Sequence, residues 1–393
     1  MWVEATRDGE AALKTDLLIA GGGLAGGLIA LALAQRRPEV TVTLVEAGAR
    51  VGGNHIWSFF DGDVAAAERA FVDPLVCHHW DGHEVAFPGV GRTLKAGYNS
   101  IESERLDAVV RASLPGERVV TGAAIVALDP AGAALADGRR IEAGGVIDTR
   151  GAVAAGTMEL GWQKFLGRLL RLERPHGLSR PVIMDATVDQ TDGYRFVYVL
   201  PFTPDHVFVE DTYYSESPAL DLPRSGGRIE AYAAARGWRI AAVEREESAA
   251  LPIVMAGDVE ALLGHDGIGR AGMAAGLFQP MTGYSLPDAV RTAALVAAAP
   301  DLSSPALERL LREHAVARWR ERGFYRLLAR LLFHAAEPKE RWRMLARFYA
   351  LDERLVGRFY AARSTLPDKL RVLIGRPPVP IGRAISVIRE SMA

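Results

Sequence analysis

Three glycines near the start of the chain have the spacing of a phosphate-binding loop. Gly21, Gly23 and Gly26 form the pattern Gly-x-Gly-x-x-Gly, between the apolar run 17–20 and an alanine- and leucine-rich run that ends at Ala34. In such a loop the first glycine turns the chain, the second lets a pyrophosphate approach the backbone, and the third lets a helix pack closely on a strand. The pattern therefore predicts a buried strand, a tight turn and a helix whose N-terminus binds phosphate.

An acid follows at the position that a dinucleotide site requires. Glu46 ends a second apolar run, 40–45, and stands twenty residues after Gly26. A carboxylate there binds the ribose hydroxyls of the adenosine half, so the order of elements predicts a dinucleotide site. The alternative is that the uncharged residues 17–34 span a membrane. Their glycines and the acidic residues before them argue against that alternative.

A second acid lies among aromatic residues in the middle of the chain. Segments 194–200 and 206–214 are predicted to be strands joined by a turn. Alternation along a strand puts on one face Tyr194, Phe196 and Tyr198 in the first segment, and Phe208, Glu210 and Thr212 in the second. A carboxyl buried against apolar side chains has a raised pKa and can donate a proton, which makes Glu210 a candidate acid. The structural alternative is a carboxylate at a strand edge that forms an ion pair.

The histidines and the cysteine do not point to a metal site. His78, His79 and His83 have a spacing that matches no standard site, so no metal is predicted. Cys77 is the only cysteine, which excludes an internal disulfide and suits a reducing cytoplasm.

Charge is distributed unevenly along the chain. The 393 residues leave room for two or three domains, and the net charge is −2. Residues 301–393, however, carry 19 Lys and Arg against 10 Asp and Glu. This region interleaves basic and aromatic residues, is predicted to be helical, and is expected to contact an anionic surface.

The predicted elements indicate an α/β fold, α+β overall, with a discontinuous Rossmann-type nucleotide-binding domain. A strand ending at Asp148 returns the chain to that domain, and the glycine-rich loop 264–284 leads into a helix at 285–298. A further amphipathic helix is predicted from Ser100, capped by Ser100 or Ser103. The predicted domains are 1–70, 99–160 and 262–300 for the nucleotide, 71–98 and 161–261 for a substrate sheet, and 301–393 for the helical C-terminal region.

Several longer stretches resemble bacterial-type lycopene β-cyclases, flavoproteins that bind FAD and close β-rings at the ends of lycopene. The resemblance runs from about Asp16 to the C-terminus. The stretches that carry it include GGGLAGGLIALAL, VGGNHIWSFF, PLVCHHW, VFVEDTYY, GLFQPMTGYSLP and GRPPVP. The glycine segments alone indicate only a glutathione-reductase-like FAD fold. The central acidic segment and TGYSLP indicate the cyclase.

The resemblance implies a cofactor site and catalytic acids. It maps a catalytic glutamate onto Glu210, and Asp211 stands where plant relatives have a second glutamate. The residues implied to contact FAD are Gly21, Gly23, Leu24, Ala25, Gly26, Glu46, Gly53 and Arg105, with Gly283, Tyr284 and Ser285 near the flavin. Reduced FAD is implied to be the active form, with NADPH as the expected reductant.

The implied reaction transfers no electrons. It adds a proton at C2 of an acyclic carotenoid end, forms a cation at C1, closes the ring onto C6 and removes the C6 proton. Aromatic rings can stabilise such a cation. The rival interpretations are a redox flavoprotein of the same fold, such as an aromatic hydroxylase or prenyl-lipid reductase, and a carotenoid-binding flavoprotein without turnover.

The expected location follows from the substrate. Lycopene is a water-insoluble hydrocarbon, so a cytoplasmic protein that is peripherally bound to a membrane is expected, with no nucleic-acid partner. Residues 301–393 are the expected contact, because arginines interleaved with aromatics suit an anionic interface. The competing possibility is that these helices pack on the body as a lid and another face meets the membrane.

Overall fold

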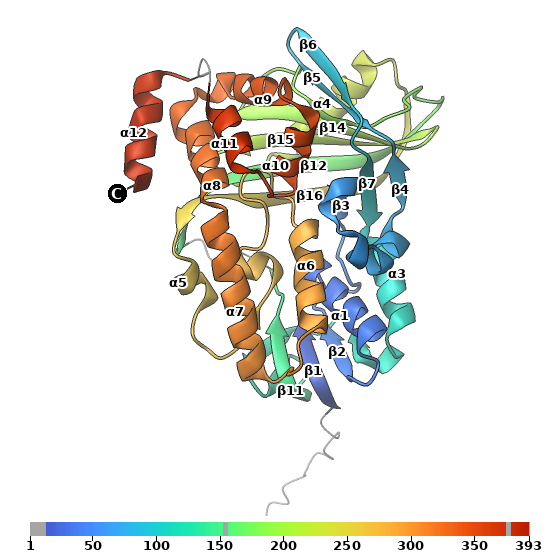
Figure 1. The fold of residues 1–393 in the computed structure, drawn as a ribbon. Helices are drawn as coiled ribbons and strands as arrows, with labels where there is room; N and C mark the ends of the chain where they lie inside the picture. Colours follow the sequence, from blue (N-terminus) through green and yellow to red (C-terminus); the bar gives the residue numbers. More distant parts are fainter. Residues whose placement is uncertain (1–12, 152–155, 375–378, 393) are drawn as a thin grey trace, which may run out of the picture.

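The structure, a computed structural model, describes residues 13–151, 156–374 and 379–392. Two seven-stranded sheets lie at opposite ends of the molecule, and helices connect and cover them (Figure 1). We call them the lower sheet, which contains β1, β2 and β11, and the upper sheet, which contains β12, β14, β15 and β16, as they stand in Figure 1.

The lower sheet combines a parallel core with an antiparallel meander. Strand β1 (Leu13–Ala20) pairs in parallel with β2 (Val42–Val45) on one side and with β11 (Arg140–Asp148) on the other. Residues 17–20 are fully buried, which explains their continuous apolar run. The remaining strands are β8 (Val119–Val120), β9 (Ile125–Asp129), β10 (Gly132–Leu135) and β17 (Gly269–Arg270). Because β17 pairs with β11, segments far apart in the sequence form one sheet.

Helices α1, α3 and α6 form one apolar core with the lower sheet. Helix α1 (Leu24–Arg36) packs against α6 (Leu286–Ala297) and α3 (Ser103–Ser113), so the predicted helices are confirmed. The predicted cap of α3 is wrong. Glu102 is its N-cap residue, and the Ser103 hydroxyl instead accepts a hydrogen bond from the backbone N–H of His55.

The upper sheet is mainly antiparallel and has long central strands. Strand β12 (Met158–Leu172) lies between β15 (His206–Ser215) and β16 (Ile240–Gly257). Strand β14 (Tyr194–Thr203) pairs with β15, so both predicted strands are confirmed. The sheet continues through β13 (Val182–Asp185), β5 (His83–Phe87) and β6 (Val90–Leu94). Helix α4 (Leu222–Ala235) packs on the face that carries Val207 and Val209.

A small third sheet and two short α-helices also lie in the part of the chain before residue 300. The third sheet consists of β3 (Ile56–Phe60), β7 (Tyr98–Glu102) and β4 (His78–Trp80). The short helices are α2 (Arg69–Val72) and α5 (Val259–Leu263).

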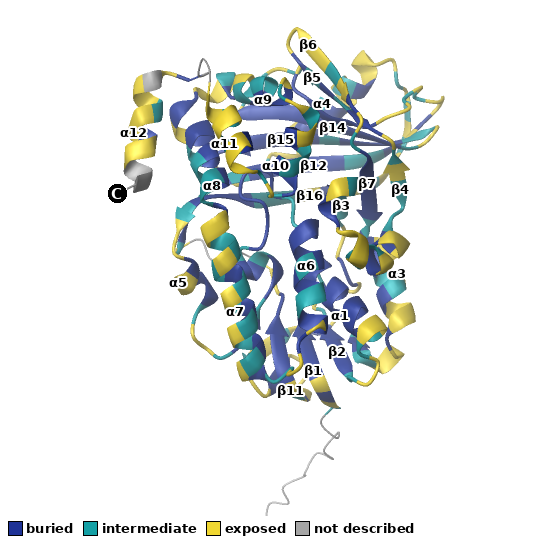
Figure 2. Cartoon of the chain, viewed as in Figure 1, coloured by how far each residue is buried: buried dark blue, intermediate teal, exposed yellow. Residues whose placement is uncertain are grey.

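The helices after residue 300 begin beside the lower sheet, where the first of them contacts β11 and β17, and continue onto the other face of the upper sheet. They are α7 (Ser304–Glu321), α8 (Gly323–Arg330), α9 (Trp342–Tyr349), α10 (Glu353–Tyr360), α11 (Leu366–Leu373) and α12 (Ile381–Met392). Helices α8, α9 and α10 share an aromatic core with β14 and β15. Tyr325, Arg341 and Tyr349 are completely or almost completely buried there, whereas α11 and α12 expose much of their surface (Figure 2). Much of the basic C-terminal region is therefore packed on the body.

The predicted fold class, with a discontinuous Rossmann-type domain and a second sheet, is confirmed. The exact domain boundaries stay a prediction. Among the described residues, no helix combines the length and apolar character needed to cross a membrane.

Candidate active site

One cavity of about 680 Å³ connects the two large sheets. Its lower end is lined by Gly21, Gly23 and Glu46, and its upper end by Glu210 and aromatic side chains. The two sets of residues singled out in the sequence thus face the same space.

The glycine loop leaves the start of α1 open to this cavity. Gly23 is the N-cap residue of α1 and makes no side-chain cap, so the first N–H groups of the helix remain available. A Cβ atom on Gly23 would meet no atom of the described residues within 4 Å, whereas one on Gly26 would lie 2.0 Å from the carbonyl oxygen of Gly21. Gly23, Leu24 and Ala25 line the cavity, and Gly26 serves the close packing of α1 on β1. This geometry suits a pyrophosphate at the helix N-terminus.

Glu46 is held in a fixed orientation at the end of β2. Its Oε2 accepts a hydrogen bond from the backbone N–H of Gly22 at 2.7 Å, and its Oε1 accepts one from that of Gly48 at 2.7 Å. The carboxylate lines the cavity and is placed to accept hydrogen bonds from ribose hydroxyls.

Two further loops enclose the middle of the cavity. Gly53 lines it from the first loop, and the stretch 283–285 (Gly283, Tyr284 and Ser285) lines it from the second. Gln163 Oε1 and Thr282 Oγ1 are buried and have no hydrogen-bond partner among the described residues, and both residues line the cavity next to the second loop. Such unpaired polar atoms fit a site for a polar ring system such as a flavin.

Arg105 lies outside this arrangement. Its side chain is exposed and donates a hydrogen bond from Nε to the carbonyl oxygen of Pro74 at 2.8 Å. Arg150 lines the cavity instead and forms a 2.9 Å ion pair with Asp148. The sequence signal for Arg150 is its place directly after the strand that returns to the glycine loop.

Glu210 faces the cavity from the centre of β15. Burial raises the pKa of its carboxyl to about 8, although a hydrogen bond from the Thr212 hydroxyl at 2.6 Å opposes this shift. The group is therefore largely neutral at pH 7 and can act as a proton donor. The aromatic residues that line the cavity are Trp57, Tyr98, Trp162, Phe165, Tyr198, Phe208 and Tyr284.

Asp211 lies on the opposite face of the same strand, because successive side chains of a strand alternate. Its carboxylate accepts a 2.6 Å hydrogen bond from Arg195 Nε and another from the Tyr213 hydroxyl. It is completely buried and is not among the residues that line the cavity. The two neighbouring acids therefore do not share one site, and Asp211 is placed to support β15 from behind.

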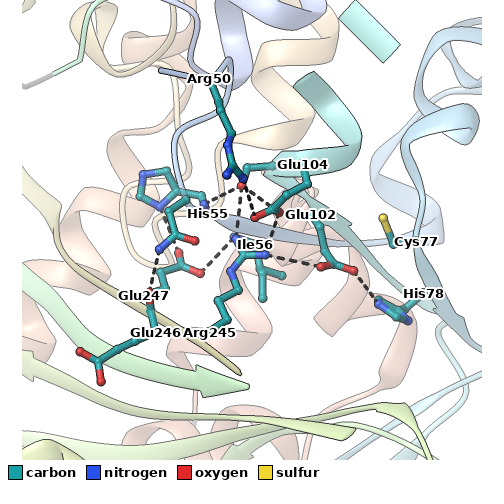
Figure 3. Close-up of polar contacts among 12 residues, drawn as sticks. Arg50, His55, Ile56, Cys77, His78, Glu102, Glu104, Arg245, Glu246 and Glu247 are labelled. Carbon is teal, nitrogen blue, oxygen red and sulfur yellow. Dashed lines mark hydrogen bonds and ion pairs between the residues drawn. The ribbon is translucent and has the colours of Figure 1, made fainter. Parts of the chain in front are cut away.

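A third acid in the cavity was not found from the sequence. Glu247 of β16 lines the cavity together with His55, whose Nδ1 lies 3.0 Å from Glu247 Oε1 (Figure 3). Glu247 ends the charged run 244–247, which has the appearance of a solvent-exposed segment. Nothing local distinguishes Glu247, because only strand pairing brings it to the cavity.

The histidines considered as metal ligands are engaged elsewhere. His78 contacts Glu102 at 3.0 Å, and His79 contacts Asn99 at 3.0 Å. Across the described ranges, no three His, Cys, Asp or Glu side chains gather in a way that could hold a metal ion.

Solved structures with the same fold include a reductase-like protein and a protein described as a flavoprotein/dehydrogenase. A geranylgeranyl bacteriochlorophyll reductase-like protein from Thermoplasma acidophilum aligns over 97% of this chain and 100% of its own, with a TM-score of 0.63 and 12% identity. A flavoprotein/dehydrogenase from Cytophaga hutchinsonii aligns over 96% and 99%, with a TM-score of 0.59 and 15% identity. At these identities the likeness establishes the fold alone.

Sequence relatives are much closer. A lycopene beta-cyclase from Pseudescherichia vulneris is 48% identical over 94% of this chain and 96% of its own length. Lycopene beta-cyclases from Pantoea ananas and from Paracoccus sp. (strain N81106 / MBIC 01143) are 42% and 43% identical, each over 95% of this chain and 97% of its own length. The family described as lycopene cyclase protein matches residues 16–386. The chain therefore belongs to the lycopene cyclase family.

Proposed function

We propose that the protein is a lycopene β-cyclase that converts the acyclic ends of lycopene to β-rings, giving γ-carotene and then β-carotene. The observation that carries this proposal is Glu210, a carboxyl whose pKa is raised to about 8 and which faces a cavity with aromatic walls. Lycopene beta-cyclases at 42–48% identity support it over the redox flavoprotein and the carrier without turnover.

In the proposed reaction Glu210 donates its proton to C2 of the acyclic end. The C1 cation that results is attacked by the C5=C6 double bond, which forms the C1–C6 bond and moves the positive charge to C5. Loss of the C6 proton then restores a C5=C6 double bond. Aromatic rings near Glu210 would stabilise the positive charge. A substrate that fills the cavity would exclude the water that could otherwise trap the cation as an alcohol.

The proposed cofactor is reduced FAD, with NADPH as the reductant. The glycine loop and the start of α1 would hold the pyrophosphate, Glu46 the ribose, and the loops at Gly53 and 283–285 the flavin ring. An electron-rich reduced flavin supplies negative charge that stabilises a nearby cation without being consumed. We leave Arg105 out of this set because its guanidinium binds a backbone carbonyl outside the cavity.

The proposed location is the cytoplasmic surface of a membrane, because the substrate must be taken from a bilayer. Helix α11 and the residue after it expose large apolar side chains: Leu366 at 70%, Leu370 at 50%, Leu373 at 44% and Ile374 at 60%. Helix α12 exposes Ile385 and Ile388. Basic side chains such as Lys369 and Arg371 stand among them, as at an anionic interface.

Product analysis tests the proposed function. Purified protein is incubated with lycopene in liposomes, FAD and NADPH without oxygen, and the pigments are separated. We expect γ-carotene and β-carotene, with NADPH consumed only to reduce the bound flavin. Oxidation of one NADPH per product would support the redox interpretation, and lycopene recovered unchanged would support the carrier.

A further inference from the structure

Glu210 and Glu247 lie on the same face of the upper sheet, one on each side of a glycine. In the strand register, Gly167 of β12 stands opposite Glu210 of β15 and also opposite Glu247 of β16. Directly opposed residues project to the same face of a sheet. With neighbouring strands about 4.8 Å apart, the two glutamates are separated by about 10 Å at their Cα atoms. Both residues line the cavity.

An aromatic ring fills the space between the two acids. A Cβ atom on Gly167 would lie 2.2 Å from Cζ of Phe208, so only glycine leaves room for that ring. Phe208 also lines the cavity. The face of the sheet therefore presents a carboxyl, a phenyl ring and a second carboxyl in a row, and a carbocation above the ring would be flanked by both acids.

Glu247 has the contacts of a carboxylate that remains available as a base. Its Oε2 accepts a hydrogen bond from the backbone N–H of Ile56 at 3.1 Å, and its Oε1 lies 3.0 Å from His55 Nδ1 (Figure 3). Its side chain is only 4% exposed. Asp211, in contrast, is bound by the guanidinium of Arg195. The His55 side chain is 45% exposed and connects Glu247 to solvent.

We propose that Glu247 is the base that removes the C6 proton, and that His55 positions it and carries the proton to solvent. This inference rests on the proposed function. The O–H bond of Glu210 breaks as the C2–H bond forms, and C6 bonds to C1. The electron pair of the C6–H bond then becomes the C5=C6 double bond, and its proton moves to Glu247. The product is an isomer of the substrate, and Glu210 regains a proton from solvent.

The position of the base determines the type of ring. The C5 cation can lose a proton from C6, from C4 or from the methyl group on C5. These losses give a β-ring, an ε-ring or a ring with an exocyclic methylene, respectively. A base fixed opposite Glu210 across Phe208 would select one of the three protons.

The test is the ring composition of the products of Glu247→Gln, with Glu246→Gln as the matched control. Glu246 is the preceding residue of β16, and it pairs with Arg168 at 2.8 Å through a side chain that is 45% exposed. Glu246→Gln should give wild-type products. Glu247→Gln should bind FAD, form β-rings about 100-fold more slowly or worse, and produce ε-rings or exocyclic rings. If the rings formed by Glu247→Gln are all β-rings, the inference is wrong at any rate of turnover.

If Glu247→Gln forms no product, isotope exchange shows whether proton addition at C2 still occurs. If Glu247→Gln yields no ring in deuterated water, we expect deuterium in the recovered lycopene, because proton addition at C2 and its reversal continue. A variant that forms no ring and incorporates no deuterium would overturn the inference. Failure of the proposed function would appear differently, as a wild-type protein that forms no ring.

Discussion

Glu210 and Asp211 are neighbours in the chain, yet the structure gives them opposite environments. Glu210 faces the cavity without a cationic partner among the described residues, and burial keeps it protonated. Asp211 faces the far side of the sheet and forms a buried ion pair with Arg195. The expected effects of substituting them therefore differ in kind.

Replacing Glu210 should stop the chemistry and leave the fold intact. Glu210→Gln keeps the shape of the side chain but cannot donate a proton, so we expect ring formation to fall about 10²- to 10⁴-fold. Pigment analysis with flavin absorbance as the control for folding checks this. A wild-type yield of β-carotene would remove Glu210 from the acid role.

The pH dependence of cyclisation should follow the protonated form of Glu210. Its folded-state pKa of about 8 lies above the ordinary value of 4.5, so the neutral acid dominates below about pH 8. The rate should therefore decline as the pH rises through about 8. The measurement is the rate of ring formation over neutral to alkaline pH with the flavin kept reduced. A rate that increases through this range would contradict the assignment.

Replacing Asp211 should mainly destabilise the protein. Asp211→Asn leaves Arg195 buried without its partner, and breaking a buried pair costs about 3–5 kcal/mol of the free energy of unfolding. The exposed pair of Asp129 and Arg140 provides a control, since Asp129→Asn should cost about 1 kcal/mol or less. Denaturant unfolding of both variants checks this. Equal stability of Asp211→Asn and wild type, with cyclisation lost, would instead support a direct chemical role.

At the scale of elements, Gly23 and Gly26 at the start of α1 have different roles. Gly23→Val places its side chain in open space, so the protein should fold but lose FAD, because the valine occupies the space of the pyrophosphate. Gly26→Ala should impair folding, since the new Cβ would lie 2.0 Å from the Gly21 carbonyl oxygen. Circular dichroism and flavin absorbance distinguish the two outcomes. An unchanged flavin spectrum in Gly23→Val would show that the pyrophosphate binds elsewhere.

The local sequence pattern of each element determines whether it could be predicted from the sequence. The glycine loop has a local pattern because its glycine spacing suits the phosphate that it is proposed to bind. Strands β14 and β15 have local patterns because aromatic residues alternate along them. Strands β12 and β16 have mixed or charged sequences, since their outer positions carry ion pairs such as that of Arg168 with Glu246. Glu247 was missed for this reason. Its link to Glu210 depends on pairing across β12, which no local pattern reveals.

At the scale of the whole molecule, the cavity joins the lower sheet to the upper sheet, and the C-terminal helices close the aromatic face. The sequence predicted both a lid and a membrane contact as alternatives for residues 301–393. Helices α8 to α10 pack on the upper sheet as a lid would, and α11 and α12 retain exposed apolar side chains. We therefore assign the proposed membrane contact to α11 and α12 rather than to the whole basic region.

Membrane binding should depend on the exposed side chains of α11. A triple variant with Leu366→Ser, Leu370→Ser and Ile374→Ser should show reduced flotation with anionic liposomes. Burying one leucine or isoleucine side chain in the membrane contributes about 1.5–3 kcal/mol to the binding free energy. Val126→Ser, at a valine that is 66% exposed on β9, is the matched control. High salt should weaken the electrostatic part of the binding to anionic liposomes. Changing Lys369 and Arg371 to Gln should weaken the same part. Equal flotation of the triple variant and wild type would show that another face meets the membrane.

Deuterium incorporation tests the central claim, proton-initiated cyclisation without redox change, most directly. Wild-type protein with reduced FAD converts lycopene in deuterated water, and the product is analysed by mass spectrometry and NMR. The account predicts β-carotene with one deuterium at C2 of each ring and no net oxidation of the flavin. β-Carotene without deuterium at C2, or flavin oxidised in proportion to product, would contradict it.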